Sequence, residues 1–351
     1  MQLEGNRGDN RFEPLNQILE RQLDADYDLG ASMALAVDGE IVLDVWGGWA
    51  DEERVKPWEA DTITNVWSTT KTMTAISALL LMERGSLDPD ATVASYWPEF
   101  AQNGKEDIRV RHILSHTSGV SAWAQPVTTE DILDDEGATA RLAAQAPWWK
   151  PGTAFGYHAL NQGHLVGEVI KRIDGRGLKQ FFAEDVAGPL DADFTIGSPP
   201  ENHHRISNVT PPPPLPLPPD LDPESVTFKT FNGPQPEAEI AHTASWRAAT
   251  IGAANGHGNA RSVAKIQAVI SNGGFSQGVQ LLSPETIDRI FIAQSHGVDQ
   301  VLMMPVRFGL GYDLAAATNA VGITSGKKCY WGGWGGSLVL NDLDNRITFT
   351  Y

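Results

Sequence analysis

The spacing of apolar residues divides the chain into strand-rich ends and a helical middle. Residues 12–24 repeat apolar side chains at intervals near 3.6, which predicts an amphipathic helix. Residues 31–50 contain two alternating apolar runs on either side of Asp38-Gly39, a pair typical of a tight hairpin turn. Residues 62–67 predict a short strand. The N-terminal part is therefore expected to form a helix, a hairpin and one further strand.

A helix from Ser68 to Arg84 is predicted directly after this strand. It is apolar on nearly all sides, so we expect it to be buried between layers. Gly85 follows it, in the position where glycine commonly ends a helix. Later stretches also show helical periodicity: residues 107–115, 159–173 and 176–188, and a segment after Gly258.

Strands return toward the C-terminus, at residues 307–313, 328–340 and 346–351. Strands at both ends and helices between them predict an α+β fold, in which an antiparallel sheet is flanked by helices and carries an inserted, mainly helical domain. We expect a sheet domain from residues 1–85 and 245–351 and a helical domain from residues 86–244. The proline-rich stretch 211–219 predicts a stiff surface connection, with a polyproline ligand for a partner domain as the alternative.

Composition narrows the function by exclusion. The 351 residues carry a formal net charge of −18, which is unsuited to binding a nucleic-acid backbone or an anionic membrane surface. A single cysteine cannot form a disulfide within the chain. No stretch reaches eighteen apolar residues, and the N-terminus lacks the apolar core of a secretory signal. These features predict a soluble cytoplasmic enzyme, and they leave its oligomeric state open.

The pattern Ser-x-x-Lys occurs three times, and only its context separates the copies. Ser325–Lys328 lies in a glycine-flanked loop, and Ser262 reads as a helix cap. Ser68 instead opens the buried helix, where residues three apart share one face, so the Lys71 amine can reach the Ser68 hydroxyl. Burial lowers a lysine pKa and makes the amine a usable base. A capping serine with a solvated lysine is the alternative.

Two further segments complete a candidate catalytic set. Tyr157 follows a Pro-Gly turn and alternating aromatic residues, as in a well-ordered loop, although core packing is its alternative. Residues 330–337 combine two tryptophans with four glycines. Glycines weaken a strand unless another group must approach its backbone, as a substrate does at an oxyanion hole. A glycine-rich bulge packed by tryptophans is the alternative for this segment.

Other apparent motifs are discounted. Residues 274–278 match Gly-x-Ser-x-Gly, but a helix precedes them where that motif requires a strand. His112 and His116 are four residues apart without the glutamate of a zinc protease, so we interpret them as structural. No metal or cofactor is expected.

Three motifs together resemble one known family: Ser-Thr-Thr-Lys at 68–71, Tyr157 after its Pro-Gly turn, and Trp-Gly-Gly at 331–333. Their order and approximate spacing are similar to those of the serine β-lactamase-related hydrolases. This family includes class C β-lactamases, DD-peptidases, family VIII carboxylesterases and acyltransferases of the lovastatin-pathway type. The resemblance extends from about residue 12 to the end of the chain. It also implies a closing helix beyond Tyr351, so we expect this chain to be truncated.

The resemblance implies a role for each matching residue. Ser68 would be the acylated nucleophile, with Lys71 and Tyr157 as its proton partners in an order that stays open. The backbone N–H groups of Ser68 and Trp334 would form the oxyanion hole. The expected substrate contacts are Trp331, Gly332, Gly333 and His158.

Two departures from the family pattern bear on the substrate. The motif Tyr-x-Asn is replaced by Tyr157-His158-Ala159, and the lysine of Lys-Thr-Gly is replaced by Trp331. Losing that cation removes a charge-assisted pair with a substrate carboxylate, worth on the order of 1.5–3 kcal/mol. The expected function is therefore hydrolysis of small carboxylic esters. Acyl transfer in secondary metabolism and a weak β-lactamase or penicillin-binding homologue are the alternatives.

Overall fold

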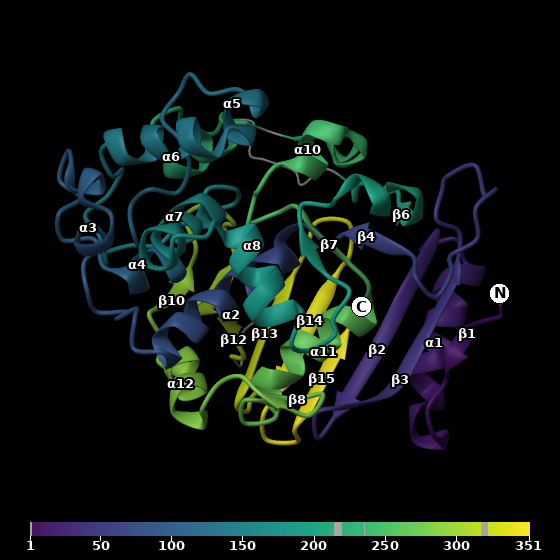
Figure 1. The fold of residues 1–351 in the computed structure, drawn as a ribbon. Coiled ribbons are helices and arrows are strands. Elements are labelled where there is room, and N and C mark those ends of the chain that lie inside the picture. Colours follow the sequence, from purple (N-terminus) through teal and green to yellow (C-terminus); the bar gives the residue numbers. More distant parts are fainter. Residues whose placement is uncertain (1, 214–219, 235, 317–321) are drawn as a thin grey trace.

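A nine-stranded antiparallel sheet forms the centre of the computed structural model, which describes residues 2–213, 220–234, 236–316 and 322–351. Its strand order is β1-β3-β2-β15-β14-β13-β12-β11-β10. Strands from the two ends of the chain thus lie side by side, and Figure 1 shows β2 and β3 in purple beside β14 and β15 in yellow. The strands are β1 (Glu4–Asn6), β2 (Gly30–Val37), β3 (Glu40–Gly48), β10 (Ser295–Val298), β11 (Pro305–Phe308), β12 (Asp313–Leu314), β13 (Lys328–Gly332), β14 (Leu338–Asp342) and β15 (Ile347–Thr350).

Most helices come from the middle of the chain, so the predicted α+β class is confirmed. They are α1 (Glu13–Asp24), α2 (Thr70–Glu83), α3 (Val93–Tyr96), α4 (Val110–Leu114), α5 (Thr129–Leu133), α6 (Asp135–Ala144), α7 (Gln162–Asp174), α8 (Leu178–Phe182), α9 (Val226–Phe231), α10 (Ala244–Ala248), α11 (Ala260–Ser271) and α12 (Pro284–Asp288). Within the described ranges, no helix is long and apolar enough to cross a membrane. The division into two domains stays a prediction.

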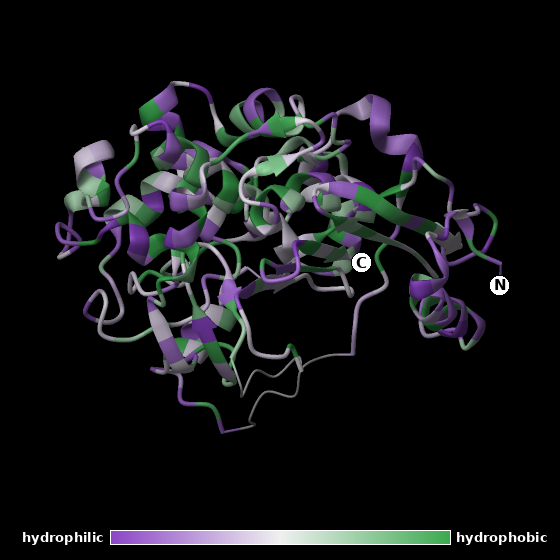
Figure 2. Cartoon of the chain, turned by 90° about the horizontal axis from the view of Figure 1, so that it is seen from below, coloured by the Kyte–Doolittle hydropathy of each residue, from purple (hydrophilic) through white to green (hydrophobic). Residues whose placement is uncertain are grey.

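The alternation along β2 explains how the sheet is covered on both faces. Ala34 packs against Ala260 and Ala264 of α11, whereas Met33 packs with Leu19 of α1. Successive side chains of a strand point to opposite faces, so one strand contacts two helices. Figure 2 shows hydrophobic residues in the interior and hydrophilic residues along the outer helices and loops.

A small mixed sheet leads the chain into the predicted buried helix. It has the order β5-β7-β4-β6, with β5 (Thr195–Ile196), β7 (Gly256–Gly258), β4 (Ile63–Asn65) and β6 (Ile206–Ser207). After β4 a short 3₁₀ turn, Trp67–Thr69, precedes α2, and α2 is buried from Thr70 to Met82. The helix packs against α7, α8 and α12. The predicted burial of this apolar helix between other elements is therefore observed.

The structure differs from the expected elements mainly at glycines. The expected strand 307–313 is split into β11 and β12, because Gly311 takes a positive φ of 77° between them. The expected strand 328–340 is likewise split into β13 and β14. The helix predicted over 176–188 is α8 followed by a π-helical turn, Ala183–Ala187. Residues 214–219 of the proline-rich stretch lie outside the described residues, so the interpretation of that stretch is untested.

Candidate active site

Ser68 lies in the 3₁₀ turn at the entrance to α2, and this turn has an unusual backbone. Trp67, the residue before it, has a positive φ of 45°, which is uncommon for a residue with a side chain. Such conformations persist where the surroundings enforce them, and they cluster at active sites. Here the turn is fixed by packing of the Trp67 ring against Trp246 and Trp334, with ring centroids 5.3 and 4.8 Å away.

The Ser68 hydroxyl meets two proton-carrying side chains. Lys71 Nζ donates to Ser68 Oγ at 3.1 Å, and the Tyr157 hydroxyl donates to the same oxygen at 2.7 Å. Lys71 Nζ also donates to the carbonyl oxygens of Ala159 (2.7 Å) and Ala253 (2.9 Å). The three residues that the sequence predicted as the catalytic set are thus brought into direct contact.

Burial shifts the pKa values of Lys71 and Tyr157 in the directions that favour their uncharged forms. Lys71 is completely buried, and desolvation lowers its pKa well below the usual value. Desolvation raises the pKa of Tyr157 to about 12, although its side-chain hydrogen bonding with Ser68 and Trp331 acts in the opposite direction. Both shifts favour an uncharged amine beside an uncharged phenol. A neutral Lys71 keeps two N–H groups for the carbonyl oxygens of Ala159 and Ala253. Its lone pair then faces Ser68, so in this form the contact reverses direction and the amine can accept the serine proton.

The turn between β13 and β14 lies directly against the nucleophile turn. Ser337 Oγ donates to the carbonyl oxygen of Val66 at 2.7 Å and lies 2.9 Å from Thr69 Oγ1. The Gly333 N–H donates to the Ser337 carbonyl at 2.7 Å, which closes the turn. Ser337 therefore holds the two segments whose amides, at Ser68 and Trp334, were expected to form the oxyanion hole.

Gly333 is the point of closest approach between these segments. A Cβ there would lie 2.2 Å from both the Val66 carbonyl oxygen and Ser337 Oγ. Gly333→Ala is therefore expected to displace the Trp334 amide and lower kcat/KM for an ester about 10²-fold, the loss typical of one oxyanion donor. Gly332→Ala is the matched control, since its Cβ would meet nothing closer than 3.6 Å. Equal losses in both variants, at similar melting temperatures, would contradict this view of Gly333.

The expected substrate contacts are only partly found at the pocket. Gly333 lines it, whereas Trp331, Gly332 and His158 do not. Trp334, which was expected in the oxyanion hole, also lines the pocket. Trp331 stacks on Phe308, and its indole lies beside Tyr157, whose pKa it helps to lower. The structure therefore does not support direct substrate contact by Trp331. It places the indole behind Tyr157.

His158 is completely buried, and its ring is engaged on both sides. Its Nδ1 lies 2.7 Å from the Gly156 carbonyl, and its Nε2 lies 2.6 Å from Ser118 Oγ. Because a carbonyl only accepts, Nδ1 carries the proton and Nε2 accepts from the serine hydroxyl. The predicted substrate contact by His158 is not supported, since its side chain stabilises the loop from behind.

The pocket in front of Ser68 has a volume of about 600 Å³ and an apolar wall. No lining residue in the described part of the chain carries a formal charge. Trp123, Leu160 and Phe231 lie on the side formed by the helical segments. The remaining lining residues are Trp67, Ser121, Ala122, Tyr157, Ala159, Asn161, Pro212, Pro213, Thr230, Pro234, Pro236, Ala254, Leu302 and 333–336.

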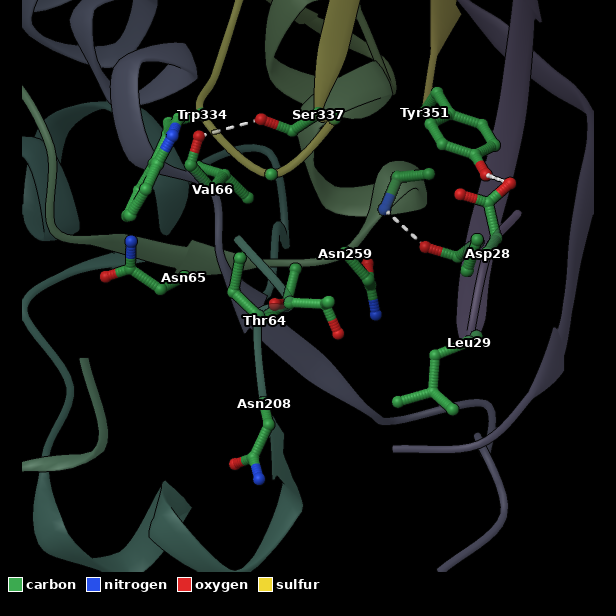
Figure 3. A pocket seen from close by; sticks show the side chains of 18 of the residues that line it. Asp28, Leu29, Thr64, Asn65, Val66, Asn208, Asn259, Trp334, Ser337 and Tyr351 are labelled. Carbon is green, nitrogen blue, oxygen red and sulfur yellow. Dashed lines mark hydrogen bonds between the residues drawn. The ribbon is translucent and has the colours of Figure 1, made fainter. Parts of the chain in front are cut away.

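A second pocket of about 370 Å³ lies beyond the glycine turn. Its lining includes Asn65, Asn259 and Asp28, and the Tyr351 hydroxyl donates to the Asp28 carboxylate at 2.6 Å. Figure 3 shows this pocket, with the Ser337 hydroxyl directed at the Val66 carbonyl above it. The two pockets share Trp334, which is 38% exposed and forms part of both walls.

The described residues offer no candidate metal site. They contain no group of three or more histidine, cysteine or acidic side chains that could hold an ion. His112 and His116, which were interpreted as structural, bond to the protein itself: His112 Nδ1 accepts from the Arg109 N–H, and His116 Nδ1 accepts from the His158 N–H.

Sequence reasoning missed two residues that support the site. Asp299 Oδ1 accepts a hydrogen bond from the Tyr157 N–H at 3.1 Å, although 142 residues separate the two. Ser337 was noted only as part of a glycine-rich segment, without its contact to Val66. Neither residue belongs to a motif with a chemical signature, so only the folded arrangement reveals them.

Comparisons with known proteins identify the family of this chain. A family model described as beta-lactamase matches residues 15–351. The Mycobacterium tuberculosis protein named Esterase/beta-lactamase LipL is 34% identical over 300 residues, which cover 81% of this chain and 68% of that protein. Among solved structures, a family VIII carboxylesterase aligns with a TM-score of 0.93 and 35% identity, over all of this chain and 93% of the other. A penicillin-binding protein homolog from Caulobacter crescentus aligns with a TM-score of 0.91 and 32% identity, over 100% and 93% of the two chains. The chain belongs to the β-lactamase family.

Proposed function

We propose that this protein is a serine hydrolase that cleaves small carboxylic esters through an acyl-enzyme on Ser68. The observation that carries the proposal is the contact of one hydroxyl with two proton carriers, Lys71 at 3.1 Å and Tyr157 at 2.7 Å. An activated serine needs a base within hydrogen-bond reach, and this site provides two. The names of the similar proteins, an esterase/beta-lactamase and a family VIII carboxylesterase, support the same reaction.

The geometry suggests how the protons move. Ser68 Oγ attacks the ester carbonyl carbon while its proton passes to the neutral Lys71 amine. The N–H groups of Ser68 and Trp334 stabilise the negative oxygen of the tetrahedral intermediate. When the C–O bond breaks, the Tyr157 hydroxyl gives its proton to the leaving alcohol and recovers one from Lys71. Water then attacks the acyl-enzyme and gives a proton to Tyr157, which passes its own proton to Lys71. Lys71 returns a proton to Ser68 Oγ as the acid leaves, so free Ser68 is restored.

The surroundings favour a neutral substrate. The pocket wall has no formal charge among its described residues. In the motif at 331–333, Trp331 takes the position where the resemblance implies a lysine in β-lactamases and DD-peptidases. A carboxylate-bearing β-lactam or peptide would enter without a cationic partner, and an unpaired buried charge is costly. An uncharged ester loses nothing by that absence. The apolar wall also suits a hydrocarbon acyl group, which gains from leaving water.

Purified protein incubated with p-nitrophenyl acetate and butyrate is expected to release p-nitrophenol, with nitrocefin turned over far more slowly. A fluorophosphonate probe is expected to add one adduct per chain, on the peptide that contains Ser68. An adduct on any other residue, or nitrocefin turnover that equals ester turnover, would contradict the proposal. The pairing of turnover with adduct mapping separates true catalysis from ester cleavage by surface nucleophiles.

A further inference from the structure

The loop that carries Tyr157 is held at three consecutive backbone amides. The Gly156 N–H donates to the His116 carbonyl at 3.0 Å, and the His158 N–H donates to His116 Nδ1 at 3.1 Å. Between them, the Tyr157 N–H donates to Asp299 Oδ1 at 3.1 Å. The tyrosine whose hydroxyl meets Ser68 is thus fixed from two sides, by a histidine before α5 and by a carboxylate after β10.

Asp299 supplies the carboxyl group of this arrangement, and its side chain is completely buried. Burial raises its pKa, whereas the hydrogen bonds from backbone N–H groups favour its ionised form. Its Oδ1 accepts two more backbone N–H groups, from Val301 and Leu302, at 2.8 Å each. Its Oδ2 is buried and has no hydrogen-bond partner among the described residues. A carboxylate that caps its own turn would need only the Val301 and Leu302 donors. The third donor comes from Tyr157, and Leu302 itself lines the pocket in front of Ser68.

We propose that Asp299 is a positioning residue for the reaction: its carboxylate holds the Tyr157 backbone in place, and its negative charge favours protonation of the Lys71–Tyr157 pair. This inference rests on the proposed esterase function. The sign of the charge effect does not depend on which partner accepts the proton first. The negative charge of Asp299 raises the pKa of the Tyr157 hydroxyl. By Coulomb's law the same charge also favours the ammonium form of Lys71, where desolvation is the main influence on the pKa. Removing that charge therefore lowers both pKa values.

The other titratable groups around the loop are Lys71 on α2, His116, His158 and Asp313 on β12. Burial lowers the pKa of His158 to about 4 and that of His116 well below its usual value, so both rings stay neutral around pH 6. Asp313 differs, since burial raises its pKa to about 6, and its charge interacts with that of Asp299. Asp313 accepts from the Tyr330 hydroxyl at 2.8 Å and makes no hydrogen bond to the Tyr157 loop. It is the neighbour that a test has to separate from Asp299.

The test compares pH profiles of kcat/KM for p-nitrophenyl butyrate. Asp299→Asn keeps an oxygen acceptor for the three N–H groups but removes the charge, so its acidic limb is expected to move to lower pH by about half a unit. Asp299→Ala also removes the acceptor, and its kcat is expected to fall about tenfold with little change in KM, as a misplaced catalytic group produces. A purely structural Asp299 would give a lower melting temperature in both variants and leave the acidic limb in place.

Asp313→Asn is the matched control, because it removes a buried carboxylate from the same region without touching the Tyr157 loop. The acidic limb of its pH profile of kcat/KM is expected to coincide with that of the unmodified protein. An acidic limb that moves in Asp313→Asn and not in Asp299→Asn would overturn the proposal, as would equal kcat values for Asp299→Asn and Asp299→Ala. Absence of ester turnover and of a Ser68 adduct in the unmodified protein would instead refute the proposed function. The two failures are therefore distinguishable.

Discussion

Ser68→Ala is expected to lower kcat/KM for p-nitrophenyl butyrate by at least about 10³-fold, to the level of residual binding and electrostatic catalysis. The substitution removes the one oxygen that both Lys71 and Tyr157 contact, so no acyl-enzyme can form. The fold should persist, because the turn that carries Ser68 is held by Ser337 and by the Trp67 ring. The measurements are ester turnover, fluorophosphonate labelling and the melting temperature.

Ser276→Ala is the matched control for this experiment. Ser276 is the serine of the Gly-x-Ser-x-Gly match, and it lies in the hairpin of β8 (Phe275–Ser276) and β9 (Val279–Gln280). Its side chain is buried, and its hydroxyl donates to the Lys265 backbone carbonyl at 2.7 Å, so its proton is directed at a group that is not a base. Turnover is therefore expected to stay near that of the unmodified protein. Loss of activity in Ser276→Ala together with retention in Ser68→Ala would reverse the assignment of the nucleophile.

Tyr157→Phe is expected to lower kcat by about 10²–10⁴-fold, the range that general acid–base groups contribute. Only the hydroxyl is lost, so the ring contacts to His116 and Trp331 remain and the backbone still bonds to Asp299. Lys71 keeps its contact with Ser68 and can still take the first proton. The expected defect is therefore in the delivery of a proton to the leaving alcohol, and it should shrink for esters whose alcohols are more acidic.

Tyr312→Phe supplies the control for loss of a buried phenol. The Tyr312 hydroxyl is fully buried and donates to Gln267 Oε1 at 3.0 Å, between α2 and α11. Its removal costs a buried hydrogen bond, about 1 kcal/mol, without touching the pocket. A similar loss of kcat in both variants would mean that Tyr157 acts through stability and not through proton transfer.

Much of the fold was predictable because its strongest signals are local. The Asp38-Gly39 turn, with φ values of 54° and 84°, joins β2 and β3 as the pattern indicated. The apolar helix before Gly85 is buried as its circumference required. The splitting of the C-terminal strands was not predictable, since an apolar run across a glycine does not show on which side of it the chain turns back.

The sequence likewise predicted some residues of the candidate site and not others. Ser68 and Lys71 could be paired from their spacing together with their place at the start of a buried helix, because residues three apart lie on one face. The roles of Trp331 and His158 could not be read in this way, since a position beside a catalytic residue does not show which way the side chain points. Asp299 carries no local signal, because its relation to Tyr157 exists only after distant loops have packed together.

The place of β15 in the sheet links the chemistry to the order in which the protein is made. β15 lies between β2 and β14, and Thr350 pairs with Ala34 across almost the whole chain. The turn that carries Trp334 is framed by β13 and β14, and β14 is held on its other side by β15. A nascent chain that already contains Ser68, Lys71 and Tyr157 would therefore remain latent. Ester turnover is expected to appear only once residues 347–350 have been synthesised and have paired with β2 and β14.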